Sequence, residues 1–137
     1  MTFTLGMVGA GQFSAHFASL FQLHPGISDI YATDVIDGRA EKLVRDIGLA
    51  GTYESFEAML DDDAVDAVAI FTQRWTHGPL VVQALRAGKH VYSAVPMAVS
   101  QTEIAAIIEA VRETGLTYMM GETSYYNPAT VFARKRL

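Results

Sequence analysis

The sequence has 137 residues, of which 50% are hydrophobic and 10% aromatic. That is enough apolar material for one folded domain of ordinary size, and it excludes an intrinsically disordered chain. There is no cysteine, which excludes a disulfide framework, a cysteine-ligated metal site and a cysteine nucleophile. The absence of cysteine also fits a reducing compartment, so we expect a cytoplasmic protein.

The charge balance argues against two classes of partner. With 15 acidic and 10 basic residues, the formal net charge is −5, whereas general nucleic-acid binders are usually basic. No apolar run reaches the ~18 residues of a membrane span. His16 and His24 lack the spacing of metal ligands relative to other candidates. We therefore expect no nucleic-acid partner, no membrane partner and no metal site.

Short apolar runs alternate with amphipathic segments along the first half of the chain. In order, we expect a strand at 3–8, a helix at 13–23, a strand at 27–33, a helix at 38–47 ended by Gly48, a strand at 52–53, a helix to residue 60 begun by Ser55, and a fully buried strand at 65–71.

The second half continues the alternation. In order, we expect a helix with Pro79 in its first turn and Gly88 beyond its end, a strand at 90–93, a helix ended by Gly115, a strand at 116–120 and a helix at 127–137. The helix that ends at Gly115 begins with a capping box formed by Ser100 and Glu103. One face of this helix carries Ile104, Ile107, Ile108 and Val111. Strands that alternate with helices predict an α/β domain with a doubly wound parallel sheet of about six strands, occupying residues 1–137.

The first strand runs into a glycine-rich turn. Glycine at positions 9 and 11 permits a tight turn and a close approach of the backbone to a diphosphate, while the next helix offers its free amides. The third position of the pattern is Ser14, a small residue that departs from the strict motif. This turn predicts a dinucleotide site formed by Gly9, Ala10, Gly11, Gln12, Phe13 and Ser14.

Asp34 lies 23 residues beyond Gly11, at the end of the second expected strand. A carboxylate there can accept both ribose hydroxyls of an adenosine and would repel a 2′-phosphate, which favours NAD over NADP. Arg39 lies nearby and offers a contact with adenine or phosphate, so NADP stays open as an alternative. The other interpretation of the pattern is a structural tight turn with a capping aspartate.

Two further segments give the chain a family resemblance. Besides the glycine turn and Asp34, the segments 71–77 (FTQRWTH) and 87–92 (AGKHVY), the latter followed by Pro96, resemble the Gfo/Idh/MocA oxidoreductases. The resemblance implies a Rossmann domain that binds NAD(P), followed by an α+β domain that holds substrate and builds oligomers. That second domain is absent from these 137 residues, so we expect this chain to be part of a longer homo-oligomeric protein with a small-molecule substrate.

The same resemblance implies an NAD(P)-dependent oxidoreductase of a sugar, polyol or related hydroxyl compound. The family usually carries a Glu-Lys-Pro triplet whose lysine moves the hydroxyl proton, but the matching residues are Ala94-Val95-Pro96. Valine cannot exchange a proton, which leaves a non-catalytic NAD(P) sensor as the alternative and an isolated fragment without activity as the expectation. Tyr125 and Tyr126, and also Glu122, are weak candidates for the missing proton donor or acceptor.

The remaining cofactor assignments come from the later strands. Phe71, Thr72 and Gln73 follow the fourth strand, and ligands of parallel sheets bind at the carboxyl ends of the strands. Ala94, at the first position of the changed triplet, is also assigned to the cofactor. His77 has two interpretations: a contact with the cofactor, or a hydrogen bond to a backbone group. Trp75 either lines the nucleotide groove or packs within its loop.

Overall fold

The computed structural model describes residues 2–136 and contains a single parallel sheet. The strand order is β3-β2-β1-β4-β5-β6, so the order reverses between β1 and β4, where the first half of the sheet meets the second. The strands are β1 Phe3–Val8, β2 Ile27–Thr33, β3 Gly51–Thr52, β4 Ala67–Ile70, β5 His90–Ala94 and β6 Tyr118–Gly121. The predicted six-stranded, doubly wound α/β fold is confirmed.

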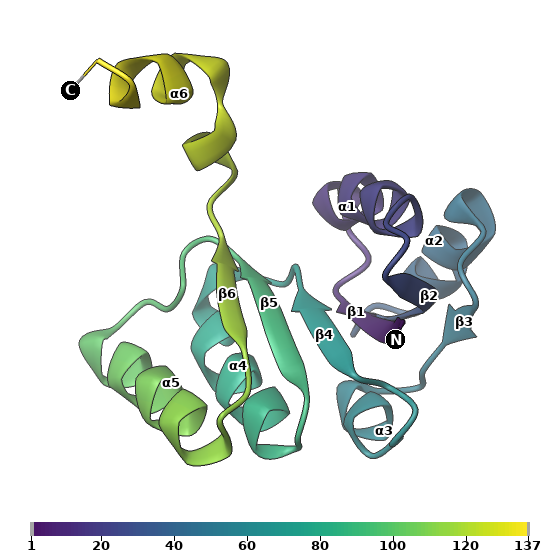
Figure 1. The fold of residues 1–137 in the computed structure, drawn as a ribbon. Helices are drawn as coiled ribbons and strands as arrows, with labels where there is room; N and C mark the ends of the chain where they lie inside the picture. The colour runs from purple at the N-terminus through teal and green to yellow at the C-terminus, as the bar shows by residue number, and fades with distance from the viewer. Residues whose placement is uncertain (1, 137) are drawn as a thin grey trace.

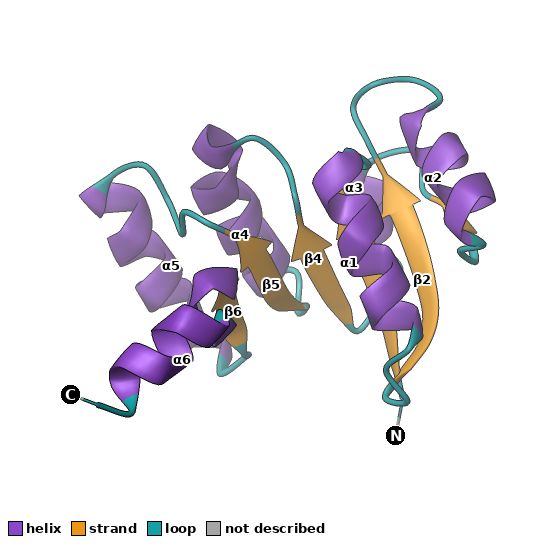
Figure 2. Ribbon diagram, turned by 90° about the horizontal axis from the view of Figure 1, so that it is seen from above, coloured by secondary structure: helices purple, strands orange, loops and turns teal. Residues whose placement is uncertain are grey.

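The helices cover the two faces of the sheet. They are α1 Gln12–Gln22, α2 Arg39–Ile47, α3 Phe56–Leu60, α4 His77–Arg86, α5 Gln101–Thr114 and α6 Pro128–Arg134, with short 3-10 helices η1 Arg74–Thr76 and η2 Thr123–Tyr126. Helices α1 and α2 share one hydrophobic core with β1 and β2, whereas α3, α4 and α5 share another with β4 and β5 (Figures 1 and 2). None of these helices is long and apolar enough to cross a bilayer.

The sequence signals that begin and end the helices act as predicted, with one change. The Ser55 and Ser100 hydroxyls accept hydrogen bonds from backbone amides in the first turns of α3 and α5. Gly48 ends α2 with a φ of +77°. The Glu103 carboxylate reaches back one residue further than a capping box requires, to the amide of Val99 at 3.0 Å. Helix α5 is therefore tied to the loop before it.

The predicted apolar face of α5 is only partly correct. Ile107 is buried, but Ile104 and Ile108 are exposed at 36% and 42%. The small side chain of Ala110 is fully buried instead. The face of α5 that packs against the sheet therefore carries Ile107 and Ala110, and not Ile104 or Ile108. Helical spacing alone does not fix which side of an apolar stripe faces the sheet.

A polar pair closes the turn between α3 and β4. The Tyr53 hydroxyl donates to the Asp62 carboxylate at 2.6 Å, and the amide of Ala64 donates to the same carboxylate at 2.8 Å. Burial and the bond to Asp62 raise the pKa of Tyr53 to about 12. The bond from Tyr53 and the Ala64 amide lower the pKa of Asp62. The pair therefore favours a protonated tyrosine and an ionised carboxylate.

The chain leaves the sheet at the carboxyl end of β6. Figure 1 shows η2 and α6 beyond that end, away from the other helices. The Asn127 side chain accepts a hydrogen bond from the amide of Ala129 and begins α6, as predicted. The helix ends at Arg134, earlier than in the predicted helix at 127–137, whose last residue, Leu137, lies outside the described residues. Large apolar side chains are exposed here, among them Met119, Tyr126 and Phe132.

Candidate cofactor-binding site

The turn after β1 requires glycine at position 9. Gly9 has φ +93°, a conformation that side-chain-bearing residues rarely adopt. A Cβ at this position would lie 2.8 Å from the carbonyl oxygen of Phe71. The Gly9 amide donates to the carbonyl of Thr33 at 2.9 Å. The turn is therefore packed between the ends of β2 and β4.

Gly11, by contrast, faces open space. It is the residue before α1, its φ of −80° suits any residue, and no side chain caps the helix. A Cβ at Gly11 would meet no heavy atom within 4 Å. Ser14 is fully buried, and its hydroxyl donates to the Gly11 carbonyl at 2.7 Å. The start of α1 thus combines free amides, the positive end of the helix dipole and room for a diphosphate.

Asp34 lies across from this turn and also supports it. One carboxylate oxygen accepts the amide of Ala10 at 2.7 Å, and the other accepts the amide of Ile36 at 2.8 Å. The side chain is half-buried. Each carboxylate oxygen can accept more than one hydrogen bond. Asp34 can therefore fix the glycine turn and still accept ribose hydroxyls.

A cleft of about 550 Å³ joins these features along the carboxyl ends of β1, β2 and β4. Seven of the predicted cofactor residues line it: Gly9, Gly11, Asp34, Arg39, Phe71, Thr72 and Gln73. The structure thus brings the glycine turn, the acidic residue and the β4 end to one hollow, as a dinucleotide that spans the sheet requires.

Six other predicted residues are not among those that line the cleft: Ala10, Gln12, Phe13, Ser14, His77 and Ala94. Ala10 and Ser14 hold the turn through the hydrogen bonds described above. The Phe13 ring packs edge-on against Phe71, with centroids 6.0 Å apart. These residues contribute to the shape of the site rather than to the walls of the cleft.

Several lining residues were not predicted from the sequence. Glu54, Ser55, Phe56 and Glu57 come from the junction of β3 and α3, and Trp75 comes from η1. The signal that could have identified the first four is position: they follow a strand of the same parallel sheet, so they share its carboxyl edge. Trp75 is 59% exposed and lines the groove, which was one of its two predicted roles.

The charges of the cleft are mainly negative. Among the described residues that line it, Arg39 is the one cation, whereas Asp34, Glu54 and Glu57 are carboxylates. Asp34 directly follows β2, Glu54 lies between β3 and α3, and Glu57 is in the first turn of α3. An adenosine bound by Asp34 would lie at this part of the cleft. A ribose with free hydroxyls suits this environment better than one with a 2′-phosphate.

His77 lies between two backbone carbonyl oxygens. It is 1% exposed, its Nδ1 lies 2.7 Å from the carbonyl oxygen of Pro96, and its Nε2 lies 3.1 Å from that of Thr72. Both ring nitrogens are thus directed at protein carbonyls. Of its two predicted roles, the hydrogen bond to a backbone group is the one that the structure shows; contact with the cofactor stays a prediction.

The predicted catalytic candidates do not line the cleft. Val95 is 42% exposed and offers no titratable group. Tyr125 and Tyr126 pack edge-on in η2, and the Arg134 guanidinium lies over the Tyr125 ring. The Glu122 carboxylate accepts the amide of Ser124 and begins η2. None of these four residues is among those that line the cleft.

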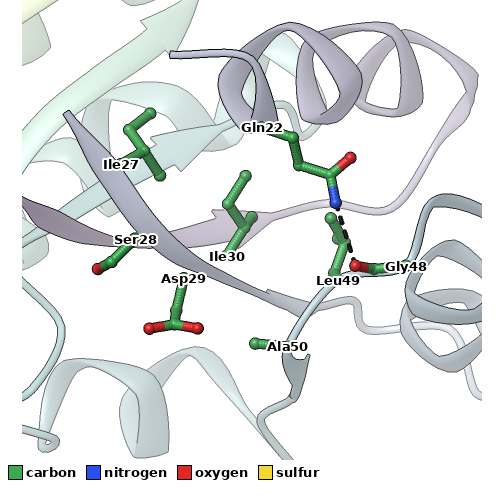
Figure 3. A pocket seen from close by; sticks show the side chains of 8 residues that line it. All are labelled: Gln22, Ile27, Ser28, Asp29, Ile30, Gly48, Leu49 and Ala50. Carbon is green, nitrogen blue, oxygen red and sulfur yellow. Dashed lines mark hydrogen bonds between the residues drawn. The ribbon is translucent and has the colours of Figure 1, made fainter. Parts of the chain in front are cut away.

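A second hollow, of about 320 Å³, lies at the amino ends of β2 and β3 (Figure 3). The Gln22 amide donates to the carbonyls of Ile47 and Gly48 beside it. Of the lining residues in the described part of the chain, Asp29 alone is charged. The hollow lacks the glycine turn and the helix start, so we assign no cofactor to it.

Together, the strand order, the glycine turn before α1 and the acidic residue after β2 define a Rossmann domain of the dinucleotide-binding class. Residues 3–122 match the profile of the GFO_IDH_MocA family, described as an oxidoreductase family with an NAD-binding Rossmann fold. The chain belongs to this Gfo/Idh/MocA oxidoreductase family.

Individual relatives agree with this placement. Over 122 residues the chain is 32% identical to scyllo-inositol 2-dehydrogenase (NAD(+)) of Bacillus subtilis, covering 89% of this chain and 36% of the relative. Over 130 residues it is 28% identical to 2,7-anhydro-N-acetylneuraminate hydratase of Escherichia coli, covering 95% and 34%. The chain thus spans about a third of the length of these curated relatives.

Solved structures show the same fold. The scyllo-inositol dehydrogenase of Lactobacillus casei with bound NAD(H) and scyllo-inositol superimposes with a TM-score of 0.87 at 23% identity, over 98% of this chain and 40% of that one. A 3-ketoreductase of Actinomadura kijaniata in complex with TDP-benzene and NADP gives a TM-score of 0.88 at 23% identity, over 98% and 43%. Within this fold, neighbours therefore carry either nicotinamide cofactor.

Proposed function

We propose that this chain is the cofactor-binding domain of an NAD-dependent oxidoreductase that acts on a sugar, a polyol or a related hydroxyl compound. The observation that carries the proposal is the open space over Gly11 at the start of α1, which shares one cleft with Asp34. A diphosphate placed there would bind the helix amides while Asp34 accepts the adenosine ribose.

The preference for NAD rests on the carboxylates of the cleft. A 2′-phosphate would lie beside Asp34, with Glu54 and Glu57 lining the same cleft. Within residues 2–136, Arg39 is the only cationic lining residue that could offset these carboxylates. We expect NADP to bind more weakly by about tenfold or more, as for a phosphate placed near like charge.

The substrate class comes from relatives that are named as inositol dehydrogenases, among them the scyllo-inositol 2-dehydrogenase of Bacillus subtilis described above. A bound NAD would supply the hydride acceptor for oxidation of a carbinol carbon. The hydroxyl proton must then pass to a base, and Val95 cannot take it. We therefore propose that the acid–base group and the substrate pocket lie outside these 137 residues, and that the chain alone binds cofactor without turnover.

Titration calorimetry with NAD, NADP and ADP-ribose tests this proposal on the chain itself. NAD and ADP-ribose should bind, with NADP weaker. A longer protein that includes this domain should then oxidise at least one compound of a polyol panel. If it binds NAD yet oxidises no polyol or sugar, the non-catalytic sensor replaces the enzyme; if the chain binds no nucleotide, both are wrong.

A further inference from the structure

His77 connects two neighbouring strands of the sheet through a single side chain. It is the first residue of α4 and is buried. Its ring lies between the carbonyl of Thr72, which follows β4, and the carbonyl of Pro96, which follows β5. These two strands pair directly, with Ile70 opposite Ser93. One imidazole thus fixes the spacing of the two turns that leave the carboxyl edge here.

Of the two contacts of the His77 ring, one is the stronger hydrogen bond. A carbonyl oxygen only accepts, so a ring nitrogen must carry a hydrogen to bond it, and a neutral imidazole carries one. The contact of Nδ1 with Pro96 is 2.7 Å and that of Nε2 with Thr72 is 3.1 Å. We place the hydrogen on Nδ1, which makes Pro96 the hydrogen-bonded partner and Thr72 the weaker contact.

The turn after β4 is itself part of the cleft. Thr72 lines it, and the Thr72 hydroxyl bonds that of Thr76 at 2.7 Å. The peptide between Phe71 and Thr72 lies directly against Gly9. Because Asp34 places the adenosine over β2, the other half of a bound dinucleotide extends over β4 and β5, where His77 holds both turns.

We infer that His77 is a positioning residue for the nicotinamide half of the cofactor: it touches no cofactor atom but holds the turns after β4 and β5 in register. The inference rests on the proposed function. It predicts a selective effect, because the adenosine and diphosphate contacts lie at Asp34 and Gly11, on other elements. Loss of the His77 hydrogen bonds should weaken NAD and leave ADP-ribose, which has no nicotinamide, unaffected.

The test compares two substitutions at this position. His77→Phe keeps a ring but removes both nitrogens, whereas His77→Asn keeps an N–H close to the position of Nδ1. His24→Phe is the control, because the His24 ring is exposed and bonds only the amide of Gly26 in the loop before β2. Calorimetry measures NAD and ADP-ribose affinity for each variant. Energy transfer from Trp75, the single tryptophan, to bound NADH reports the nicotinamide position independently.

We expect His77→Phe to lower NAD affinity about tenfold, equivalent to about 1.4 kcal/mol, and His77→Asn to stay within about threefold of the original chain. ADP-ribose affinity should change less than about twofold in every variant. Energy transfer to NADH should fall in His77→Phe alone. Unchanged NAD affinity in His77→Phe, or an equal loss for NAD and ADP-ribose, would overturn the inference.

The measurements on the original chain separate a failure of the proposed function from a failure of this inference. If the original chain binds neither nucleotide, the proposed function fails and this inference fails with it; if it binds both and the variants match it, only the inference fails. If His77→Phe does not fold, His77→Gln, whose longer amide reaches the Nε2 side, is compared with His77→Asn. NAD binding weaker in His77→Gln than in His77→Asn supports the inference, and equal binding overturns it.

Discussion

Replacing each of the two turn glycines with alanine separates folding from binding. Gly9→Ala places a methyl group 2.8 Å from a backbone oxygen at a φ of +93°, so we expect a loss of at least about 2 kcal/mol in unfolding free energy. Gly11→Ala meets nothing within 4 Å at an ordinary φ, so its stability should stay within about 1 kcal/mol of the original. The methyl at position 11, however, occupies the space that we assign to the diphosphate.

The binding consequence of Gly11→Ala follows from the hydrogen bonds at risk. A hydrogen bond to a charged group contributes about 1.5–3 kcal/mol, so displacing one amide–phosphate contact should weaken NAD about 10- to 100-fold. Urea unfolding measures the stability of both variants, and calorimetry measures NAD affinity for the variant that folds. Full NAD affinity in a stable Gly11→Ala chain would refute the placement of the diphosphate over α1.

Other consequences concern charge, pH and association. Asp34→Ala should weaken NAD about tenfold and NADP less, while Asp29→Ala, at the other end of β2, should change neither; equal losses for the two cofactors in calorimetry would remove Asp34 from the ribose. Tyr53→Phe should cost about 1 kcal/mol at neutral pH in urea unfolding. Because the folded-state pKa of Tyr53 is raised to about 12 from an ordinary value of 10.0, its contribution is complete below pH 10.0 and is lost as the pH rises through about 12. The phenylalanine variant should therefore lose less stability than the original chain across that range, and parallel profiles would contradict this. The exposed apolar side chains of β6 and α6 predict self-association of the chain at high concentration, and a monomer at every concentration in light scattering would count against it.

The elements that were predictable are those with local signals. Ser55 and Ser100 cap their helices through contacts three residues away, and Gly48 ends its helix by its own φ. The glycine turn was predictable for the same reason, because its residues lie close together in the sequence. Asp34 was predictable only because parallel strands place their ends along one edge.

The remaining features depend on contacts between distant segments. The bond from the Ala10 amide to Asp34 spans 24 positions, and it gives the acidic residue a structural role that the motif does not contain. The carboxylates Glu54 and Glu57 reach the cleft through the position of β3 at the sheet edge. His77 had two interpretations from the sequence, and its hydrogen bond to a backbone group could be identified only from the positions of the Thr72 and Pro96 carbonyls.

The most direct test is to find where a dinucleotide binds on this chain. A titration of the 15N-labelled chain with NAD, followed by the backbone amide signals, measures this. We predict that the largest shifts fall on Gly11 and the first turn of α1, with further shifts at Asp34 and Thr72. Shifts confined to the hollow of Gln22 and Ala50, or no saturable shifts at all, would contradict the account.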